Sequence, residues 1–287
     1  METFETYRSL LFSIAYRMTG SVMEAEDLVQ ETYLRIQAAD ATQITSYRAF
    51  LTTIITRLAI NVLNSSRERR EHYIGPWLPE PMLTANNPHL VHPVERDDAF
   101  DSISTAFLLL LETLTPLERA VFLLKEVFDY RYEEIAQILD RTEAACRKLG
   151  TRAKQHILDK RPRFVVSTEQ YQRVIDSFLN ACQTGDLEGL ISLLTQDAII
   201  YSDGGGKAVA GTRPVGGQEI VARFILGGLR VIADHAYTWD IMELNGRPAI
   251  VVRVEGKAFG VVQFELSGHQ LIDEIHFITN PDKIGHL

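Results

Sequence analysis

The sequence predicts a multidomain protein with two all-α domains, the second a helix-turn-helix, followed by a C-terminal α+β domain with a curved antiparallel sheet. Three observations lead to this fold class. Apolar residues recur at helical spacing over residues 1–72 and again from Val94 to about residue 160. Five prolines in residues 73–93 interrupt that pattern, because neither a helix interior nor a central strand tolerates proline. From Ala236 onward the apolar period becomes two, as in strands with one buried face.

The first domain is expected to contain three helices. An apolar helical face that starts at Leu10 predicts the first, and Gly20 ends it. Ser21 and Glu24 then match a capping box, in which each side chain bonds the other residue's backbone N–H. A third helix is expected to begin near Ser46, and its far end, "NVLNSSRERRE", is polar and basic.

The second domain is expected to follow the proline-rich linker. Thr115, Pro116 and Glu118 predict a helix start, with proline at the first helical position inside a capping box. Two shorter helices are expected at 132–139 and 143–159, separated by "DRT". The expected boundaries of the first domain, the linker, the second domain and the C-terminal domain are 1–72, 73–93, 94–163 and 168–287.

The C-terminal domain combines helices with a meander of strands. Helices are expected at 169–182, 187–194 and 217–229, ahead of the period-two segments. Asn245-Gly246 stands between two of those segments and is a strong short-range signal for a hairpin. This order predicts helices packed on an antiparallel sheet.

Charge is unevenly placed along the chain, whose 287 residues carry a formal net charge of −9. Residues 141–163 hold eight Lys and Arg against two acids, a balance of +6, whereas residues 166–287 hold nine bases against fifteen acids, a balance of −6. A short basic stretch beside acidic segments is typical of an interaction surface. A solvated helix face is the alternative.

The sequence lacks the features of an exported or membrane-spanning chain. Its first residues, "METFETYRSL", do not follow the basic-then-apolar order of a signal peptide. The longest apolar run, 106–114, is too short to cross a bilayer. We therefore expect a cytoplasmic protein. Cys146 and Cys182 both fall on apolar helix faces and are expected to be buried, without a metal or a disulfide.

Residues 132–157 fit a helix-turn-helix. Ala136 stands where the helices cross, Asp140 at the turn, and Cys146 on the inner face of the second helix. Asp140 occupies a position where such motifs often have glycine. The outer face of the second helix is basic, as in a helix that enters the major groove, where Arg reads guanine and Lys and Thr hold phosphates. The residues expected on this DNA-binding face are Arg141, Thr142, Arg147, Lys148, Thr151, Arg152 and Lys154.

The order of these parts resembles an extracytoplasmic-function sigma factor of bacterial RNA polymerase. "SIAYRMTGSVMEAEDLVQETYLRI" is similar to the first half of sigma region 2, "SYRAFLTTIITRLAINVLNSSRERRE" to its second half, and the helix-turn-helix to sigma region 4. The match covers residues 1–72 and about 112–160 in the family's order. It implies a sigma factor that binds core RNA polymerase and directs promoter recognition and transcription initiation, and not an enzyme. A simple repressor, the alternative, leaves residues 1–72 unexplained.

The resemblance also implies two further sites in region 2. The helix "DLVQETYLR" is expected to dock on the polymerase clamp, with an exposed polar face as the alternative, and the loop around Asn61 to Arg67 is expected to hold a flipped base of the −10 element. Small hydrogen-bonding groups beside cations suit capture of an unstacked base and a displaced strand. The expected polymerase contacts are Asp27, Leu28, Gln30 and Glu31. The expected −10 contacts are Arg57, Asn61, Asn64, Ser65, Ser66, Arg67, Arg69 and Arg70.

The last part of the chain, about 120 residues, resembles a SnoaL-like domain, the cone-shaped fold shared with ketosteroid isomerases. A subgroup of these sigma factors carries such an extension together with three motifs: a WLPEP linker, a DGGG-basic loop and an NPDK tail. The resemblance implies that the extension stands in for a separate anti-sigma factor, which is then not strictly required. The matching residues are Trp77, Leu78, Pro79, Glu80, Pro81, Asp203, Gly204, Gly205, Gly206, Lys207, Asn280, Pro281, Asp282 and Lys283.

The glycine-rich segment "DGGGK" does not match a phosphate-binding P-loop, which needs four residues between its glycines and then Lys-Ser or Lys-Thr. Instead, Gly204 to Gly206 are expected to form a turn with positive φ at a strand end. Another backbone can then approach closely, and we expect the linker or the tail there, with Trp77 as a hydrophobic anchor and Lys207 or Asp203 pairing polar groups. A glycine turn without a partner is the alternative.

A rival interpretation gives the extension a small apolar ligand to bind or convert. Folds of this kind enclose an apolar cone in which acid–base groups can work. However, the available groups show no diagnostic spacing, and His276 is expected to be a packed strand residue. No cofactor or metal is expected. The groups are Asp203, His235, Tyr237, Asp240 and His276.

Overall fold

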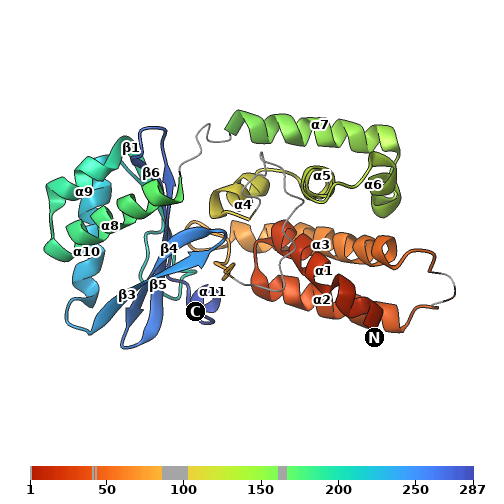
Figure 1. Ribbon diagram of the computed structural model, residues 1–287, viewed down its shortest axis with the longest axis horizontal. Coiled ribbons are helices and arrows are strands. Elements are labelled where there is room, and N and C mark those ends of the chain that lie inside the picture. The colour runs from red at the N-terminus through yellow and green to blue at the C-terminus, as the bar shows by residue number, and fades with distance from the viewer. Residues whose placement is uncertain (1, 41, 43, 86–102, 161–166) are drawn as a thin grey trace. The chain divides into compact units, whose positions relative to one another are not determined.

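The chain forms two compact units in a computed structural model (Figure 1). One unit comprises Met1–Glu71 and Thr84–Arg161, and the other comprises His72–Leu83 and Pro162–Leu287. The linker segment 72–83 therefore belongs to the C-terminal unit. No helix in the described part of the chain is long and apolar enough to cross a membrane. The structure describes residues 2–40, 42, 44–85, 103–160 and 167–287, without the side chains of residues 2, 3, 66–71 and 160.

The first unit begins with the three helices that the sequence predicts. Gly20, with φ of 70°, takes the left-handed conformation after the first helix. Ser21 then caps the second helix, because its Oγ accepts a hydrogen bond from the Glu24 N–H at 3.2 Å. The three helices are α1 Glu2–Thr19, α2 Val22–Gln37 and α3 Tyr47–Glu71.

Helix α3 runs unbroken through the segment where we expected a loop. The expectation of a loop around Asn61 to Arg67 is wrong, since these residues are helical. The stretch contains no glycine or proline to end a helix. Moreover, Ser65 Oγ donates to the Val62 carbonyl within the helix at 2.9 Å, so this serine fits the helical turn rather than interrupting it.

The second half of this unit carries the helix-turn-helix. Its expected start at Val94 lies outside the described residues. The capping box is confirmed: Thr115 Oγ1 accepts from the Glu118 N–H, and the Glu118 carboxylate accepts from the Thr115 N–H at 3.1 Å. Asp140 takes the left-handed conformation in the turn, with φ of 53°. The helical segments are α4 Thr105–Glu112, α5 Pro116–Phe122, the π-helical turn η2 Leu123–Val127, α6 Tyr132–Leu139 and α7 Glu143–Lys160.

Polar contacts join α3 to the helix-turn-helix within the first unit. The Tyr130 hydroxyl lies 2.8 Å from Thr52 Oγ1 and accepts from Arg48 Nε at 3.3 Å. Arg57 Nε donates to the carbonyl of Ile138 at 2.8 Å, near the end of α6. Carbonyls in the last turn of a helix lack intrahelical donors, so Arg57 supplies one.

The C-terminal unit is an α+β domain around a six-stranded sheet in the order β2-β1-β6-β5-β4-β3. Strands β3 to β6 form the expected antiparallel meander, with Asn245 (φ 54°) and Gly246 (φ 73°) at the predicted hairpin. The strands are β1 Leu194–Asp203, β2 Val215–Gly216, β3 Tyr237–Leu244, β4 Arg247–Val254, β5 Lys257–Leu266 and β6 Ile272–Ile278. The helices are α8 Thr168–Thr184, α9 Leu187–Leu193, α10 Gln218–Ile232 and α11 Pro281–Ile284.

The sheet is mixed rather than wholly antiparallel as expected. β1 pairs in parallel with β6, because the chain passes through β2, α10 and the strands β3 to β5 before returning beside β1. Helices α8, α9 and α10 cover one face of the sheet, and α11 lies on the other side (Figure 1). The core between helices and sheet includes Phe178, Leu190, Val221 and Phe264, each at most a few per cent exposed. Both cysteines are buried, as expected.

Candidate functional site

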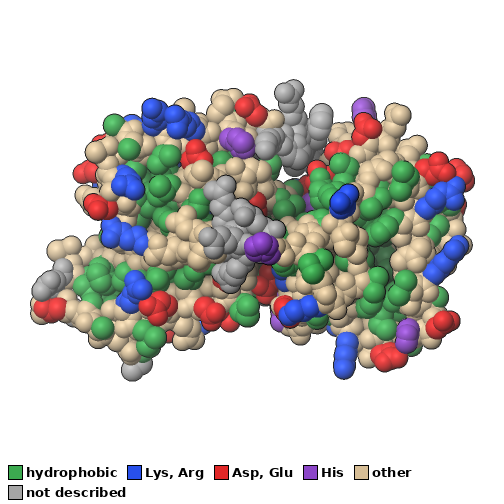
Figure 2. All heavy atoms as spheres, turned by 180° about the vertical axis from the view of Figure 1, so that it is seen from behind, with side chains coloured by type: hydrophobic (Ala, Val, Ile, Leu, Met, Phe, Trp, Pro, Cys, Tyr) green, Lys and Arg blue, Asp and Glu red, His purple; other side chains and the backbone are tan. Residues whose placement is uncertain are grey.

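Helix α7 presents the predicted basic face to solvent. Cys146, Ala153 and Ile157 on its inner side are fully buried. Basic side chains lie along the outer edge of this part of the unit, at the upper left of Figure 2. The residues predicted for the −35 element are all exposed: Arg141, Thr142, Arg147, Lys148, Thr151, Arg152 and Lys154.

Several of these residues already have partners within the protein. Arg147 forms an ion pair with Glu143 one turn earlier and lies over the ring of Tyr132, with 4.9 Å from Cζ to the ring centroid. Lys154 Nζ lies 2.9 Å from Glu126 Oε2. Exposed ion pairs contribute at most about 1 kcal/mol, so phosphates can replace them. The four-residue spacing of Glu143 and Arg147 was readable in the sequence but was missed.

Thr142 has a structural role that was not predicted. Its Oγ1 accepts the Ala145 N–H at 3.2 Å and so caps the start of α7. An N-terminal cap satisfies one of the free donors of the first turn.

The far end of α3 is the second predicted DNA surface. Asn61, Asn64 and Ser65 are exposed there. Arg57 differs from the prediction, because its guanidinium bonds the end of α6 in this structure. The side chains of the remaining predicted residues lie outside the described ones: Ser66, Arg67, Arg69 and Arg70.

Helix α2 carries the residues predicted to contact polymerase. Asp27 and Gln30 are exposed, and Glu31 is half-buried and paired with Arg35 at 2.8 Å. Leu28 is only 6 % exposed and packs inward. Leu28 therefore anchors α2 in the core, and Asp27, Gln30 and Glu31 form the outward face of the helix.

Asp203, at the end of β1, is the centre of a buried polar cluster in the C-terminal unit. The residue is 0 % exposed. Its Oδ1 accepts from the Tyr73 hydroxyl at 2.5 Å and from the Gly205 N–H at 3.1 Å. Its Oδ2 accepts from the Leu78 N–H at 2.8 Å and from Lys283 Nζ at 2.7 Å. These four donors offset the desolvation of the carboxylate. We call Asp203, Asn280, Lys283 and the glycine turn 204–206, together with the bound linker residues 73–82, the linker site.

Lys283 joins the tail to the linker. Besides Asp203, its Nζ binds the Leu78 carbonyl at 2.5 Å and lies over the rings of Tyr73 and Trp77, 5.2 and 4.3 Å from their centroids. The aromatic faces stabilise the ammonium. Leu78 is 1 % exposed, whereas Trp77 is half-buried. Trp77 therefore covers a cation, and Leu78 is the more deeply buried apolar residue of the motif.

Tyr73 was missed by the sequence analysis, since it precedes the recognised linker motif. Its hydroxyl donates to Asp203 and accepts from Asn280 Nδ2 at 2.9 Å. Burial, together with the hydrogen bond to Asp203, raises the pKa of Tyr73 above its usual value. The hydroxyl therefore stays protonated and available as a donor.

The glycine turn allows both the linker and the tail to approach. Gly205 and Gly206 have the expected positive φ, 58° and 70°, whereas Gly204 does not have a positive φ. A Cβ on Gly205 would lie 2.3 Å from Asn280 Nδ2, and one on Gly206 would lie 2.8 Å from Ile74 Cδ1. The linker and the tail thus both pack against the glycine turn, as expected, but through the side chains of Ile74, Tyr73 and Asn280 rather than through their backbone.

The other end of the linker is bound to the β3–β4 hairpin and the tail. The Met82 N–H donates to Asn245 Oδ1 at 3.0 Å, and the Asn245 N–H donates to the Met82 carbonyl at 2.9 Å. His286 Nε2 lies 3.0 Å from the Pro81 carbonyl. The intervening Pro79, Glu80 and Pro81 are buried. At the rim, Lys207 forms an exposed ion pair with Asp282.

The residues of the rival enzymatic interpretation are engaged in other contacts. Asp240 pairs with Arg253 at 2.5 Å, and His235 is exposed beside Glu255 at 3.3 Å. His276 is fully buried on β6, as expected, and its ring packs 5.8 Å from that of Tyr201. Tyr237 packs edge-on against Trp239. Within the described residues, no group of three or more side chains could hold a metal ion.

Comparison with known proteins identifies the family. Sequence models of Sigma-70 region 2 and Sigma-70 region 4 match residues 3–69 and 104–157. The ECF RNA polymerase sigma factor SigJ of Mycobacterium tuberculosis H37Rv is 38 % identical over 226 residues, which cover 78 % of this chain and 71 % of SigJ. The chain belongs to the ECF RNA polymerase sigma factors. Helices α1 to α3 thus form region 2 of this sigma factor, and α4 to α7 form region 4.

The likeness extends into the C-terminal unit. A probable ECF sigma factor, SigI of M. tuberculosis CDC 1551, is 29 % identical over 286 residues, 99 % of this chain and 94 % of SigI. The crystal structure of M. tuberculosis SigJ superposes with a TM-score of 0.77 at 31 % identity and covers 99 % of this chain and 98 % of that one. The sigma factor therefore shares with SigJ a fold that includes the α+β extension.

We expect Asp203→Asn to destabilise the C-terminal unit of the sigma factor by about 3–5 kcal/mol, because it leaves the buried Lys283 ammonium without its carboxylate. Urea unfolding of the full chain measures this loss. Asp282→Asn is the matched control, since it breaks an ion pair whose two side chains are both exposed. That variant should lose less than about 1 kcal/mol. Equal losses in the two variants would contradict the role given to Asp203.

Proposed function

We propose that this sigma factor contacts core RNA polymerase through the polar face of α2, the −10 element through the far end of α3 and the −35 element through α7. We further propose that its C-terminal unit regulates this activity by holding the linker. The observation that carries the proposal is the ordered pair of sigma regions, in which the predicted −35 residues of α7 and the polar residues predicted on α2 are exposed or half-buried. Such a protein acts in the cytoplasm, with RNA polymerase and promoter DNA as partners.

The charge of α7 supports its placement in the major groove. The stretch 141–163 carries a balance of +6. Lys148 and Arg152 are exposed and have no ion pair among the described residues. To reach a base, Arg147 has to leave its exposed ion pair with Glu143 and its stacking on the ring of Tyr132. A cationic helix face that rests on a rigid inner core can contact phosphates while keeping its register.

The face of α2 supports its assignment to polymerase. Asp27, Gln30 and Glu31 point outward from a helix that Leu28 and Val29 anchor in the core. A polar surface on a rigid helix is suited to a partner with complementary charge.

Replacing Asp27 and Glu31 together with alanine should weaken binding to core polymerase by roughly tenfold or more, equivalent to ~1.4 kcal/mol. Fluorescence titration of the labelled full chain with purified core enzyme measures this change. Glu5→Ala, an exposed acid on α1, is the control for lost negative charge. If the double variant binds as tightly as the control, α2 is not the polymerase contact.

Alanine substitutions on α7 should separate base contacts from phosphate contacts. Arg147→Ala should cost ~1–3 kcal/mol and relax specificity at one position of the −35 element. Lys148→Ala should weaken all promoter sequences about equally and lower the salt slope by about one unit. Run-off transcription and holoenzyme binding over a salt series are the measurements, with Lys257→Ala on the C-terminal sheet as control. Unchanged affinity and slope in both variants would remove α7 from the groove.

The linker site controls the length of free chain between the two sigma regions. α3 ends at Glu71, and the C-terminal unit binds the chain from Tyr73 to Met82. Once released, residues 72–83, twelve in all, can span at most about 40 Å when fully extended. The −35 and −10 elements lie about 85 Å apart along the duplex, at ~3.4 Å per base pair. A bound linker therefore restrains the separation of regions that promoter recognition requires. Because this restraint lies within the chain, no separate anti-sigma factor is strictly required.

Gly205→Ala should release the linker and raise transcription at limiting core polymerase. The new methyl group meets Asn280, which cannot turn away without losing its bonds to Tyr73 and to the Asp282 N–H. Gly256→Ala is the matched control, because Gly256 also has positive φ, 79°, but its Cβ would meet nothing within 4 Å. Proteolysis within 72–83 and run-off transcription are the measurements. Unaltered output and protection in Gly205→Ala would argue against regulation through the linker.

We infer that the C-terminal unit is not an enzyme. Asp203 is saturated by four donors, and Asp240 is paired with Arg253, so neither carboxylate is free to act as a general base. The favoured role for this unit is therefore regulation.

A further inference from the structure

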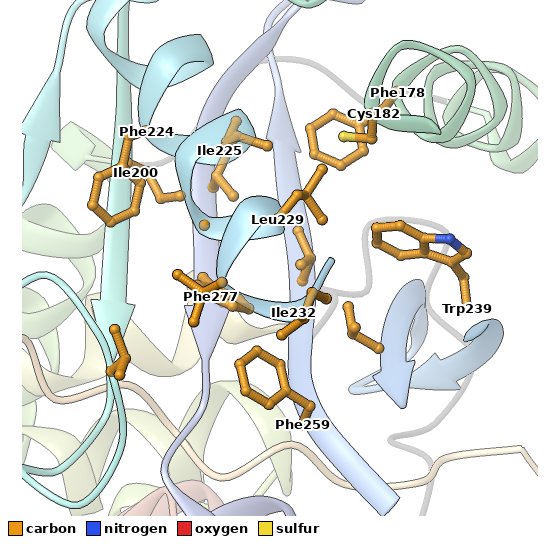
Figure 3. Close-up of a pocket in the computed structure, with 16 residues that line it drawn as sticks. Phe178, Cys182, Ile200, Phe224, Ile225, Leu229, Ile232, Trp239, Phe259 and Phe277 are labelled. Carbon is orange, nitrogen blue, oxygen red and sulfur yellow. The ribbon is translucent and has the colours of Figure 1, made fainter. Parts of the chain in front are cut away.

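The C-terminal unit contains an apolar cavity of about 90 Å³ between the sheet and helices α8 and α10. Figure 3 shows Phe178 and Cys182 of α8, Leu229 of α10, Trp239 of β3 and Phe277 of β6 around it. Val209 and Val231 also line it and are 74 % and 56 % exposed, so the cavity has a mouth to solvent. Hydrophobic side chains are also visible on the face of this unit in Figure 2.

The lining restricts the chemistry of an occupant. No charged side chain, hydroxyl or amide side chain is among the lining residues. Burial also raises the pKa of the Cys182 thiol to about 12, so the sulfur lining the cavity is neutral. A charged or strongly hydrogen-bonding ligand would lose its hydration without compensation. The volume is of the order of the ~150 Å³ apolar cavity that admits benzene. These facts fit an uncharged molecule of one aromatic ring or a short hydrocarbon chain.

Helix α10 keeps space open at the cavity. Gly227 and Gly228 stand together in its interior, where glycine disfavours a helix relative to alanine. A Cβ on either residue would meet nothing within 4 Å, so close packing does not require these glycines. Gly228 lines the cavity and Gly227 does not. A larger side chain at Gly228 would occupy the space that a ligand needs.

The cavity and the linker site share two neighbouring strands. Ile200 of β1 lines the cavity, and the same strand ends at Asp203. Phe277 of β6 lines it as well, and the chain then reaches Asn280 of the linker site three residues later. The two strands are paired in parallel from Ile199 to Asp203. The same two strands therefore form part of the cavity wall and lead to the groups that hold the linker.

We propose that this cavity binds a small uncharged aromatic or aliphatic molecule, and that its occupancy loosens the linker site. The binding step stands on the cavity alone, whereas the regulatory step rests on the linker restraint proposed above. Ligand binding would then be the signal that frees the sigma regions for core polymerase. The ligand acts by favouring the state in which the wall formed by β1 and β6 has moved.

The two tryptophans of the chain allow each step to be measured separately. Trp239 lines the cavity, and Trp77 lies in the linker site. In full-length Trp77→Phe, toluene should change Trp239 fluorescence with saturation. Benzoate, a similar-sized anion, should not. In the wild-type chain, toluene should increase cleavage within residues 72–83, and in full-length Trp239→Phe, which keeps an aromatic ring in the lining, it should also change Trp77 fluorescence.

Gly228→Leu should fill the cavity and abolish the toluene response, whereas Gly227→Leu, its neighbour outside the cavity, should retain it. Gly228→Ala adds a single methyl group and should weaken toluene binding less than Gly228→Leu does. If the leucine variant does not fold, the alanine variant is the one to measure. Equal responses in wild type, Gly228→Leu and Gly228→Ala would overturn the site, as would saturable binding of benzoate.

The remaining outcomes also decide the proposal. If toluene does not bind and the molecular mass of the protein in solution rises with its concentration, a second copy of the chain covers the cavity. That result would overturn the ligand site. A saturable Trp239 response with unchanged Trp77 fluorescence and unchanged linker cleavage would overturn the regulatory step. Gly205→Ala tests regulation through the linker in the absence of any ligand. A failure of that proposed regulation can therefore be distinguished from a failure of the cavity to bind a ligand.

Discussion

The C-terminal unit depends on one buried ion pair, between Asp203 and Lys283. A carboxylate with no exposed surface needs donors on both oxygens, and here the linker, the glycine turn and the tail each supply at least one. Three segments far apart in the sequence must therefore be in place together. This requirement gives a common physical reason for the WLPEP, DGGG and NPDK motifs, which are far apart in the sequence.

The two halves of the sigma factor use charge in opposite ways. Region 4 exposes Arg147 and Lys154 in surface ion pairs that a phosphate can replace. The linker site buries its charges, so that breaking one contact leaves another group unpaired. Arg57 belongs to both patterns: predicted for the −10 element, it is bonded to the end of α6 in this structure. In this structure its guanidinium therefore contacts region 4 while the side chain stays exposed.

Local signals in the sequence were sufficient for most element boundaries. The capping box at Thr115 and Glu118 and the hairpin at Asn245 act within a few residues, so their chemistry is readable directly. The parallel pairing of β1 with β6, the contact of Arg57 with α6 and the role of Tyr73 depend on residues that are distant in sequence. No local pattern encodes such pairings. For the same reason, Trp77 was given the place in the core that Leu78 takes.

The order of residues along the chain makes the linker site late to form during synthesis. Lys283 Nζ binds the Leu78 carbonyl across 205 positions. Closing so long a loop costs chain entropy that local contacts cannot repay until the C-terminal unit has folded. Regions 2 and 4, which form one unit of their own, leave the ribosome before the residues that hold the linker exist. A nascent chain thus carries both sigma regions before the residues that bind its linker have been synthesised.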